Sequence, residues 1–148
     1  MPSPRPPRSA FVRFVPMTTR IRDNDLYRHM HNVTYYEFFD TAVNEWLIDH
    51  GKLNLPEGPV IGLVVETRCT YLESLKWPGR VEVGMRIERI GNTSITYIMG
   101  LFAEGAPEAA AEARYIHVYV NAADHRPVPL PDTLRRAAEA LLLPAPAV

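Results

Sequence analysis

The sequence predicts an α+β fold in which a curved antiparallel sheet of about five strands wraps around one long central helix, with a short helix near the C-terminus. Residues 33–50 carry a wide apolar stripe at helical spacing, and several later segments have the composition and alternation of strands. No helical pattern separates those later segments. Adjacent parallel strands need long crossover connections, so we expect the four later strands to form an antiparallel meander.

The N-terminal residues 1–10 are rich in proline, and we predict that they form a mobile tail before a single domain at 11–148. Residues 11–22 are predicted to contain the first strand. Pro16 lies within it, and proline cannot donate a hydrogen bond inside a sheet. The first strand is therefore expected at a sheet edge.

The long helix is predicted over residues 33–50, with Asn32 as its N-cap and Gly51 just past its end. Its apolar positions follow the i, i+3, i+4, i+7 rule. They are Tyr35, Phe38, Phe39, Ala42, Val43, Trp46 and Leu47. A stripe of this width indicates that the sheet encloses the helix.

Four strands and a second helix follow the long helix. Gly91-Asn92 predicts a hairpin turn, and the segment after it, apolar on both faces at its far end, suits a central strand. A short helix near 131–143 is predicted to end at Pro144. The predicted strands are residues 60–75, 81–90, 93–103 and 111–121.

Bulk properties exclude several classes of function. A formal net charge of −1 and a pI near 6.5 give no sign of a nucleic-acid or anionic-membrane partner. No apolar run approaches the roughly 18 residues of a membrane helix. A single cysteine, Cys69, excludes an intramolecular disulfide and suits a reducing cytoplasm, where we expect the protein to act.

The polar stretch at 23–32, D-N-D-L-Y-R-H-M-H-N, is open to three interpretations. Its carboxylates and imidazoles could bind a metal, but their spacing matches no zinc or calcium signature, so we expect no metal. They could form an acid/base site. Alternatively, Asp23 and Asp25 could be turn residues whose side chains accept backbone hydrogen bonds.

The pattern D-x-D-x-x-x-H-x-x-N-x-x-Y, which runs from Asp23 to Tyr35, closely resembles the signature of hotdog-fold thioesterases. The match is to the 4-hydroxybenzoyl-CoA thioesterase-like branch, in which the usual sequence of the motif is D-T-D-x-x-G-H-V-N-N-x-x-Y. By element order the resemblance spans about residues 12–130. Arg28 stands where the family usually has glycine, and His31 replaces its first asparagine. The first departure bears on the loop, because glycine adopts positive φ far more easily.

The resemblance implies a hotdog fold and an acyl thioester of coenzyme A as substrate, with no cofactor beyond that coenzyme A. It implies a homodimer with a continuous sheet and two sites at the interface, or a dimer of dimers. The catalytic residues it suggests are Asp25, His29 and Asn32. Thioester hydrolysis needs an activated water or a nucleophile and a site for the oxyanion.

Asp25 would act as general base or nucleophile, and His29 would orient the carboxylate, the water or the thioester. The first N–H groups of a helix lack intrahelical partners, so those near Asn32, Val33 and Thr34 would polarise the carbonyl. Tyr36 is expected to line the acyl pocket.

Arg68 is a candidate partner for the phosphates of coenzyme A. It could instead pair with Glu66 on the same strand face. Glu66 or Glu73 could also assist as a second carboxylate.

Two other functions stay open at this stage. The same fold could support a hydratase or dehydratase of acyl thioesters, or a non-catalytic module that binds acyl thioesters or a metal. The acyl group, and the choice between coenzyme A and an acyl carrier protein, are not indicated by the sequence.

Overall fold

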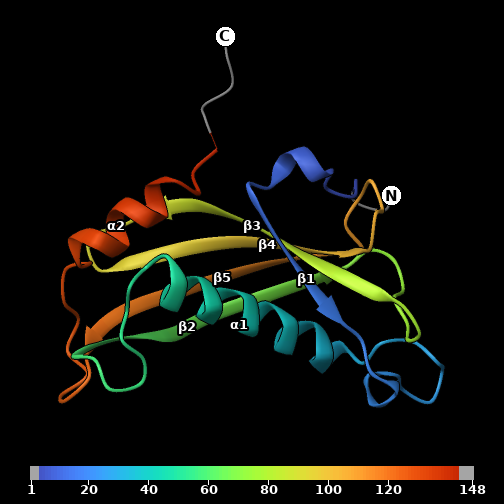
Figure 1. The fold of residues 1–148 in the computed structure, drawn as a ribbon, viewed down its shortest axis with the longest axis horizontal. Helices are drawn as coiled ribbons and strands as arrows, with labels where there is room; N and C mark the ends of the chain where they lie inside the picture. The colour runs from blue at the N-terminus through green and yellow to red at the C-terminus, as the bar shows by residue number, and fades with distance from the viewer. Residues whose placement is uncertain (1–3, 144–148) are drawn as a thin grey trace, which may run out of the picture.

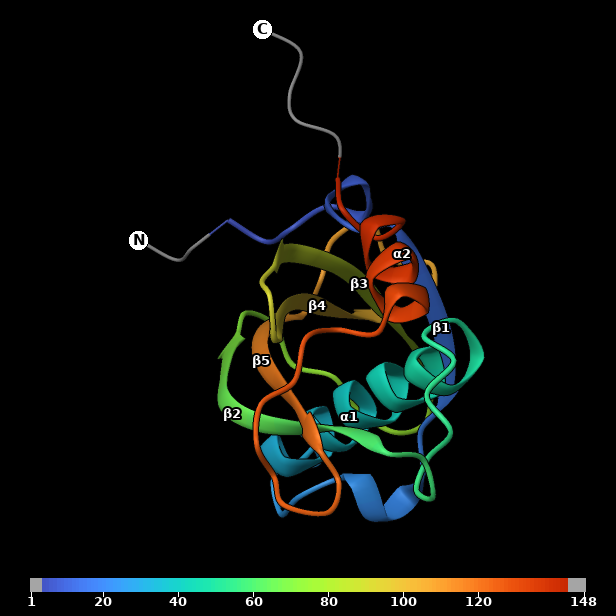
Figure 2. The same ribbon diagram turned by 90° about the vertical axis from the view of Figure 1, so that its left-hand side faces the viewer.

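The computed structural model describes residues 4–143, which form a five-stranded antiparallel sheet curved around one long helix, as predicted (Figure 1). Turned by 90°, the sheet curls around α1 from β2 on one side to β1 on the other (Figure 2). The strands are β1 (Arg13–Thr18), β2 (Val60–Tyr71), β3 (Arg80–Ile90), β4 (Ser94–Ala103) and β5 (Ala111–Asn121), and the helices are α1 (Asn32–Asp49) and α2 (Asp132–Glu139).

The spatial order of the strands, β1-β3-β4-β5-β2, confirms two expectations and corrects a third. β1 lies at an edge, as Pro16 predicts, and β4 is the central strand, buried on both faces. The four-strand meander was wrong, because β2 pairs with β5 and leaves only β3-β4-β5 in sequence order. β3 already has β1 on its other edge, so the open edge of β5 is the one that β2 can join.

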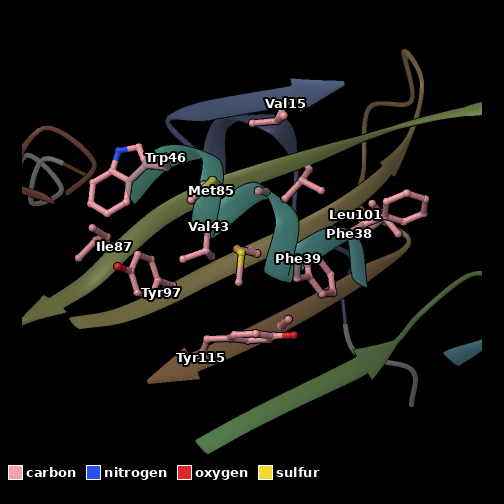
Figure 3. Packing of buried hydrophobic residues seen from close by; sticks show 14 of the residues in the cluster. Val15, Phe38, Phe39, Val43, Trp46, Met85, Ile87, Tyr97, Leu101 and Tyr115 are labelled. Carbon is pink, nitrogen blue, oxygen red and sulfur yellow. The ribbon is translucent and has the colours of Figure 1, made fainter. Parts of the chain in front are cut away.

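The core lies between α1 and the concave face of the sheet (Figure 3). Trp46 meets Tyr97 edge to face at 5.9 Å, and Phe39 meets Tyr115 at 6.3 Å. Burying one such side chain stabilises the fold by roughly 1.5–3 kcal/mol. The helix is thus held along its length by the sheet.

The start of α1 differs from the prediction, whereas Gly51 lies just past its end as predicted. The helix begins at Asn32 and its N-cap is His31, so Asn32 is not the cap. At the other end Lys52, and not Gly51, adopts the left-handed conformation, with φ of 58°. A Cβ on Gly51 would lie 2.9 Å from Cδ1 of Leu134, so this glycine is needed for the close approach of α2. Neither α1 nor α2 has the length and apolarity of a membrane span.

Helix α2 ends at Glu139, short of the predicted residue 143. The chain is diverted there because the N–H of Ile87 donates to the carbonyl of Leu141 at 2.9 Å, and Leu142 forms a bridge beside Ile87. Sheet pairing therefore replaces the last helical turn. Pro144, expected to end the helix, lies outside the described residues.

The N-terminal segment contacts the rest of the chain at two arginines. Arg5 Nε donates to the carbonyl of Ala109 at 2.8 Å, and Arg8 Nε donates to that of Ala106 at 2.8 Å. Residues 1–3 lie outside the described part. The mobility of residues 1–10, and a domain boundary at residue 11, stay predictions.

His117 is a buried histidine on the inner face of β5. Within residues 4–143 neither of its ring nitrogens has a hydrogen-bond partner, and the rings of Tyr97, Tyr115 and Tyr119 surround it at 5.1–6.5 Å. Burial lowers the pKa of His117 to about 4. The same burial raises the pKa of each tyrosine, so His117 is the group in this cluster that titrates below neutral pH.

We predict that His117 makes the protein acid-sensitive. Its pKa is about 4 in the folded chain against an ordinary 6.5, so its contribution to stability is complete above pH 6.5 and is lost as the pH falls toward 4. The loss amounts to about 3 kcal/mol by pH 4. Urea unfolding at several pH values should show a shallower decline in the free energy of unfolding for His117→Leu than for wild type.

The control for this prediction is His125→Asn, at an exposed histidine. It should keep the wild-type pH dependence. If His117→Leu and wild type lose the same free energy between pH 7 and 4, the buried imidazole is not the sensor.

Candidate active site

A cleft of about 530 Å³ lies at the N-terminal end of α1 and brings together the three predicted catalytic residues, Asp25, His29 and Asn32. Its other walls come from Tyr35 on α1 and from residues 71–74, at the end of β2 and just beyond. The loop between β1 and α1 therefore faces the far end of β2 across this cleft.

Backbone hydrogen bonds close the loop around Asp25. The N–H of Asp25 donates to the carbonyl of His29 at 2.7 Å, and the N–H of Arg28 donates to the carbonyl of Asp25 at 3.1 Å. Arg28 has φ of 62°, in the left-handed region. The loop thus adopts, with arginine, the backbone conformation that glycine adopts most easily.

One carboxylate oxygen of Asp25 is used in the turn. Its Oδ1 accepts the N–H groups of Tyr27 at 2.7 Å and His29 at 3.2 Å, so the hydrogen-bonded turn considered from the sequence is present. In the described chain Oδ2 accepts no hydrogen bond. Partial desolvation acts to raise the pKa of Asp25, but the N–H groups of His29 and Tyr27 outweigh it and the pKa lies below its ordinary value. The group is ionised at neutral pH.

The first turn of α1 offers two free donors. Among residues 4–143, the N–H groups of Asn32 and Val33 have no acceptor, whereas that of Thr34 donates to the carbonyl of His31 at 3.0 Å. The hydroxyl of Tyr71 donates to the carbonyl of Asn32 at 3.3 Å, which ties this turn to β2. Two of the three expected oxyanion donors are thus available, at the positive end of the helix dipole.

Asp23 is a structural residue rather than a second acid in the cleft. It is buried, and the guanidinium of Arg20 contacts both of its oxygens, at 2.9 and 3.2 Å. Arg20 also reaches Glu37 on α1 at 3.2 Å. The N–H of His31 donates to the carbonyl of Asp23 at 2.7 Å, so this ion-pair network fixes where the helix begins.

The other side of the loop is fixed to the segment between β2 and β3. The side chain of Asn24 both donates to the carbonyl of Trp77 at 3.0 Å and accepts its N–H at 2.9 Å. A second cleft, of about 560 Å³, borders Asp25 here and is lined also by Arg28, Lys76 and Trp77. This cleft was not predicted, because residues 24 and 77 are joined only by tertiary contacts.

None of the four expected substrate-binding residues lines the Asp25 cleft. Val33 and Thr34 line a separate cleft, and Tyr36 packs near Tyr115 at 5.9 Å. Arg68 lies opposite Arg114, on the outer face of the sheet. A single chain therefore does not place these four side chains around Asp25.

The ion pair between Glu66 and Arg68 that their shared strand face suggested is not formed within the described residues. Glu66 pairs instead with Arg114 on β5 at 3.1 Å. Arg114 lies diagonally across the strand pair from Glu66, a separation that a long side chain can span.

Of the four cleft residues on the β2 side, Tyr71 and Glu73 carry side chains that bear on the chemistry. Tyr71 was missed, because nothing in its spacing links it to the signature. Glu73, weighed as an assisting carboxylate, accepts the N–H of Ser74 at 3.1 Å and lies 3.8 Å from Arg5. The described chain contains no group of three or more His, Cys, Asp or Glu side chains that could hold a metal ion.

We predict that Arg28→Gly raises the free energy of unfolding by ~0.5–1 kcal/mol. A residue with a Cβ in the left-handed region destabilises the folded chain by ~1–2 kcal/mol, which glycine would relieve. The greater freedom of glycine in the unfolded chain offsets ~0.4–1 kcal/mol of this stabilisation. Urea unfolding measures the difference. Arg28→Ala removes the guanidinium but keeps the strain, so it should stay within ~0.5 kcal/mol of wild type; equal gains in both variants would locate the effect in the side chain.

Comparisons with known proteins agree with this architecture. A family model described as the thioesterase-like superfamily matches residues 19–138. No curated protein matches the chain. The chain is similar to the solved structure of the PA5185 protein from Pseudomonas aeruginosa strain PAO1, with 49% identity and a TM-score of 0.92 over 94% of this chain and 97% of that one.

Two further solved structures share the fold. The PA2801 protein of Pseudomonas aeruginosa, described as a candidate thioesterase, is 26% identical with a TM-score of 0.80, over 86% of this chain and 98% of that one. Slr0204, a 1,4-dihydroxy-2-naphthoyl-CoA thioesterase from Synechocystis, is 16% identical with a TM-score of 0.76, over 84% and 93%. The family model covers most of the chain, so the resemblance carried by Asp23–Tyr35 is confirmed: the chain belongs to the thioesterase-like superfamily and is a hotdog-fold thioester hydrolase.

Proposed function

We propose that the protein hydrolyses acyl-CoA thioesters to a free carboxylic acid and coenzyme A, with Asp25 as the reactive carboxylate. The observation that supports this most is the shared cleft of Asp25 and the first turn of α1. An ionised carboxylate with a free oxygen lies there with Asn32, whose N–H lacks an acceptor, and the next N–H of the helix, that of Val33, lacks one as well. A base and an oxyanion site are the two elements that thioester hydrolysis requires.

The reaction follows from these positions. The thioester carbonyl oxygen accepts hydrogen bonds from the N–H groups of Asn32 and Val33, which stabilise the negative charge it gains. In one route Oδ2 of Asp25 takes a proton from water, whose oxygen adds to the carbonyl carbon; the C–S bond then breaks and the leaving thiolate of coenzyme A receives that proton. In the other route Oδ2 adds directly, the C–S bond breaks with departure of the thiolate, and water hydrolyses the resulting anhydride to the free acid and Asp25. His29, at the rim, orients the carboxylate or the water.

Coenzyme A enters as part of the substrate, and no further cofactor is proposed. The cleft on the other side of Asp25 offers Arg28 and Lys76 as cations for phosphates and the ring of Trp77 for an adenine. The naphthoyl-CoA substrate in the name of the Synechocystis protein agrees with coenzyme A as carrier.

We propose a homodimer that joins through β2, or a dimer of such dimers. β2 is an edge strand with an open row of backbone groups, and Val64, Val65 and Tyr71 on it are 44–59% exposed. Open edges of this kind are usually paired or covered. Tyr71 also lines the Asp25 cleft, so a partner on this edge would complete the site. The single cysteine agrees with a cytoplasmic protein.

We predict that Asp25→Asn lowers turnover of acyl-CoA esters by about 10²-fold or more. The asparagine oxygen can still accept the N–H groups of Tyr27 and His29, so the turn is kept while the negative charge is lost. The measurement is release of free thiol from short, long and aromatic acyl-CoA esters in the presence of EDTA.

The matched control is Asp124→Asn, since Asp124 Oδ1 accepts the N–H of Arg126 at 3.0 Å in a similar exposed turn. It should leave turnover unchanged. Equal activity in Asp25→Asn would make Asp25 a turn residue only. Enoyl product without free thiol would instead indicate a hydratase or dehydratase, and a lack of turnover on every ester would favour an acyl-carrier substrate or a binding role.

A further inference from the structure

A further cleft lies at the other end of α1 from Asp25. It has a volume of about 570 Å³ and is lined by residues at the start of β1, at the C-terminal end of α1 and on or just after α2. This volume falls within the range of small-ligand sites. Neither the signature nor the proposed reaction uses any of its residues.

Most of the lining is apolar. Trp46, which is 2% exposed, forms its inner wall, and Val12 on the β1 side is 42% exposed. Ala137 on α2, and Ala140 and Leu141 just past its end, also line the cleft. The cleft therefore offers an aliphatic chain an apolar surface on several sides.

The cleft also contains cationic side chains that lack an anionic partner. Arg13 and Arg136 both line it, and within residues 4–143 no carboxylate pairs with either. Nη1 of Arg13 lies 3.0 Å from Nε2 of His50. A guanidinium can only donate, so the imidazole nitrogen is the acceptor.

The remaining nitrogens of Arg13 indicate which ligand would fit. Its Nε has no acceptor in the described chain, but it is buried and out of reach of a ligand in the cleft. His50 occupies Nη1, so Nη2 is the nitrogen that can still donate to a ligand. Nη2 and the guanidinium of Arg136 are donors that suit the oxygens of a carboxylate.

The anion-binding charge of the two arginines is partly offset by the C-terminal end of α1, which lies at this cleft and carries a partial negative charge. That charge opposes a dianionic phosphate more strongly than a carboxylate. Of these two anions, the monoanion is therefore the one that the arginines hold more easily. An apolar wall beside cationic donors is the combination that an amphiphilic acid needs.

We propose that this cleft binds a monocarboxylate with an aliphatic chain, its carboxylate on Nη2 of Arg13 and near Arg136, and its chain along Trp46 and α2. The inference is independent of the proposed hydrolysis. A binding measurement tests it without reference to turnover.

The chain contains its own probe for this cleft, because it has two tryptophans and only Trp46 lines it. In a Trp77→Phe background, fluorescence reports on Trp46 alone. Titration with octanoate should give a saturable change in Trp46 emission, whereas octanol and acetate at equal concentration should bind at least tenfold more weakly.

Arg136→Gln, at an exposed helix position, and Arg13→Gln should each weaken octanoate binding about tenfold. Arg126→Gln, a surface arginine outside the cleft, is the control and should bind like the parent. Circular dichroism checks that every variant folds. The proposal is overturned if Trp46 emission does not saturate, if octanol binds as well as octanoate, or if folded Arg136→Gln binds octanoate as the control does.

Discussion

Helix α1 buries eight of its eighteen residues against the concave face of the sheet, and the other features depend on that enclosure. The middle of the helix has no freedom to shift, because Phe39, Ala42 and Val43 have no exposed surface. Both helix ends are therefore fixed in space. One lies at the cleft that contains Asp25, and the other brings the negative end of the dipole to the cleft of Arg13.

The loop before α1 is held by contacts on two sides, which explains how it tolerates Arg28 in a left-handed conformation. The network of Arg20, Asp23 and Glu37 fixes it to the helix, and the paired hydrogen bonds of Asn24 fix it to Trp77. Local strain persists where the surrounding structure determines the backbone. The position of Asp25 thus depends on groups that take no part in the proposed chemistry.

The surroundings of the two carboxylates of the signature give them different roles. Asp23 is buried and receives a guanidinium on both oxygens, while Asp25 is half-buried and receives only backbone N–H groups on one. The sequence pattern D-x-D treats them alike. Only their burial and partners distinguish a structural acid from one that can meet a substrate.

The sequence by itself determined the element types, the edge position of β1 and the grouping of Asp25, His29 and Asn32, because each rests on local periodicity, on proline chemistry or on a short signature. It did not determine the partner of β2, the early end of α2, or the roles of Tyr71 and Arg13. Those depend on which edges and faces remain open after the sheet has closed around α1. Pairing between residues far apart in the chain is set by that competition for space, which only the tertiary structure decides.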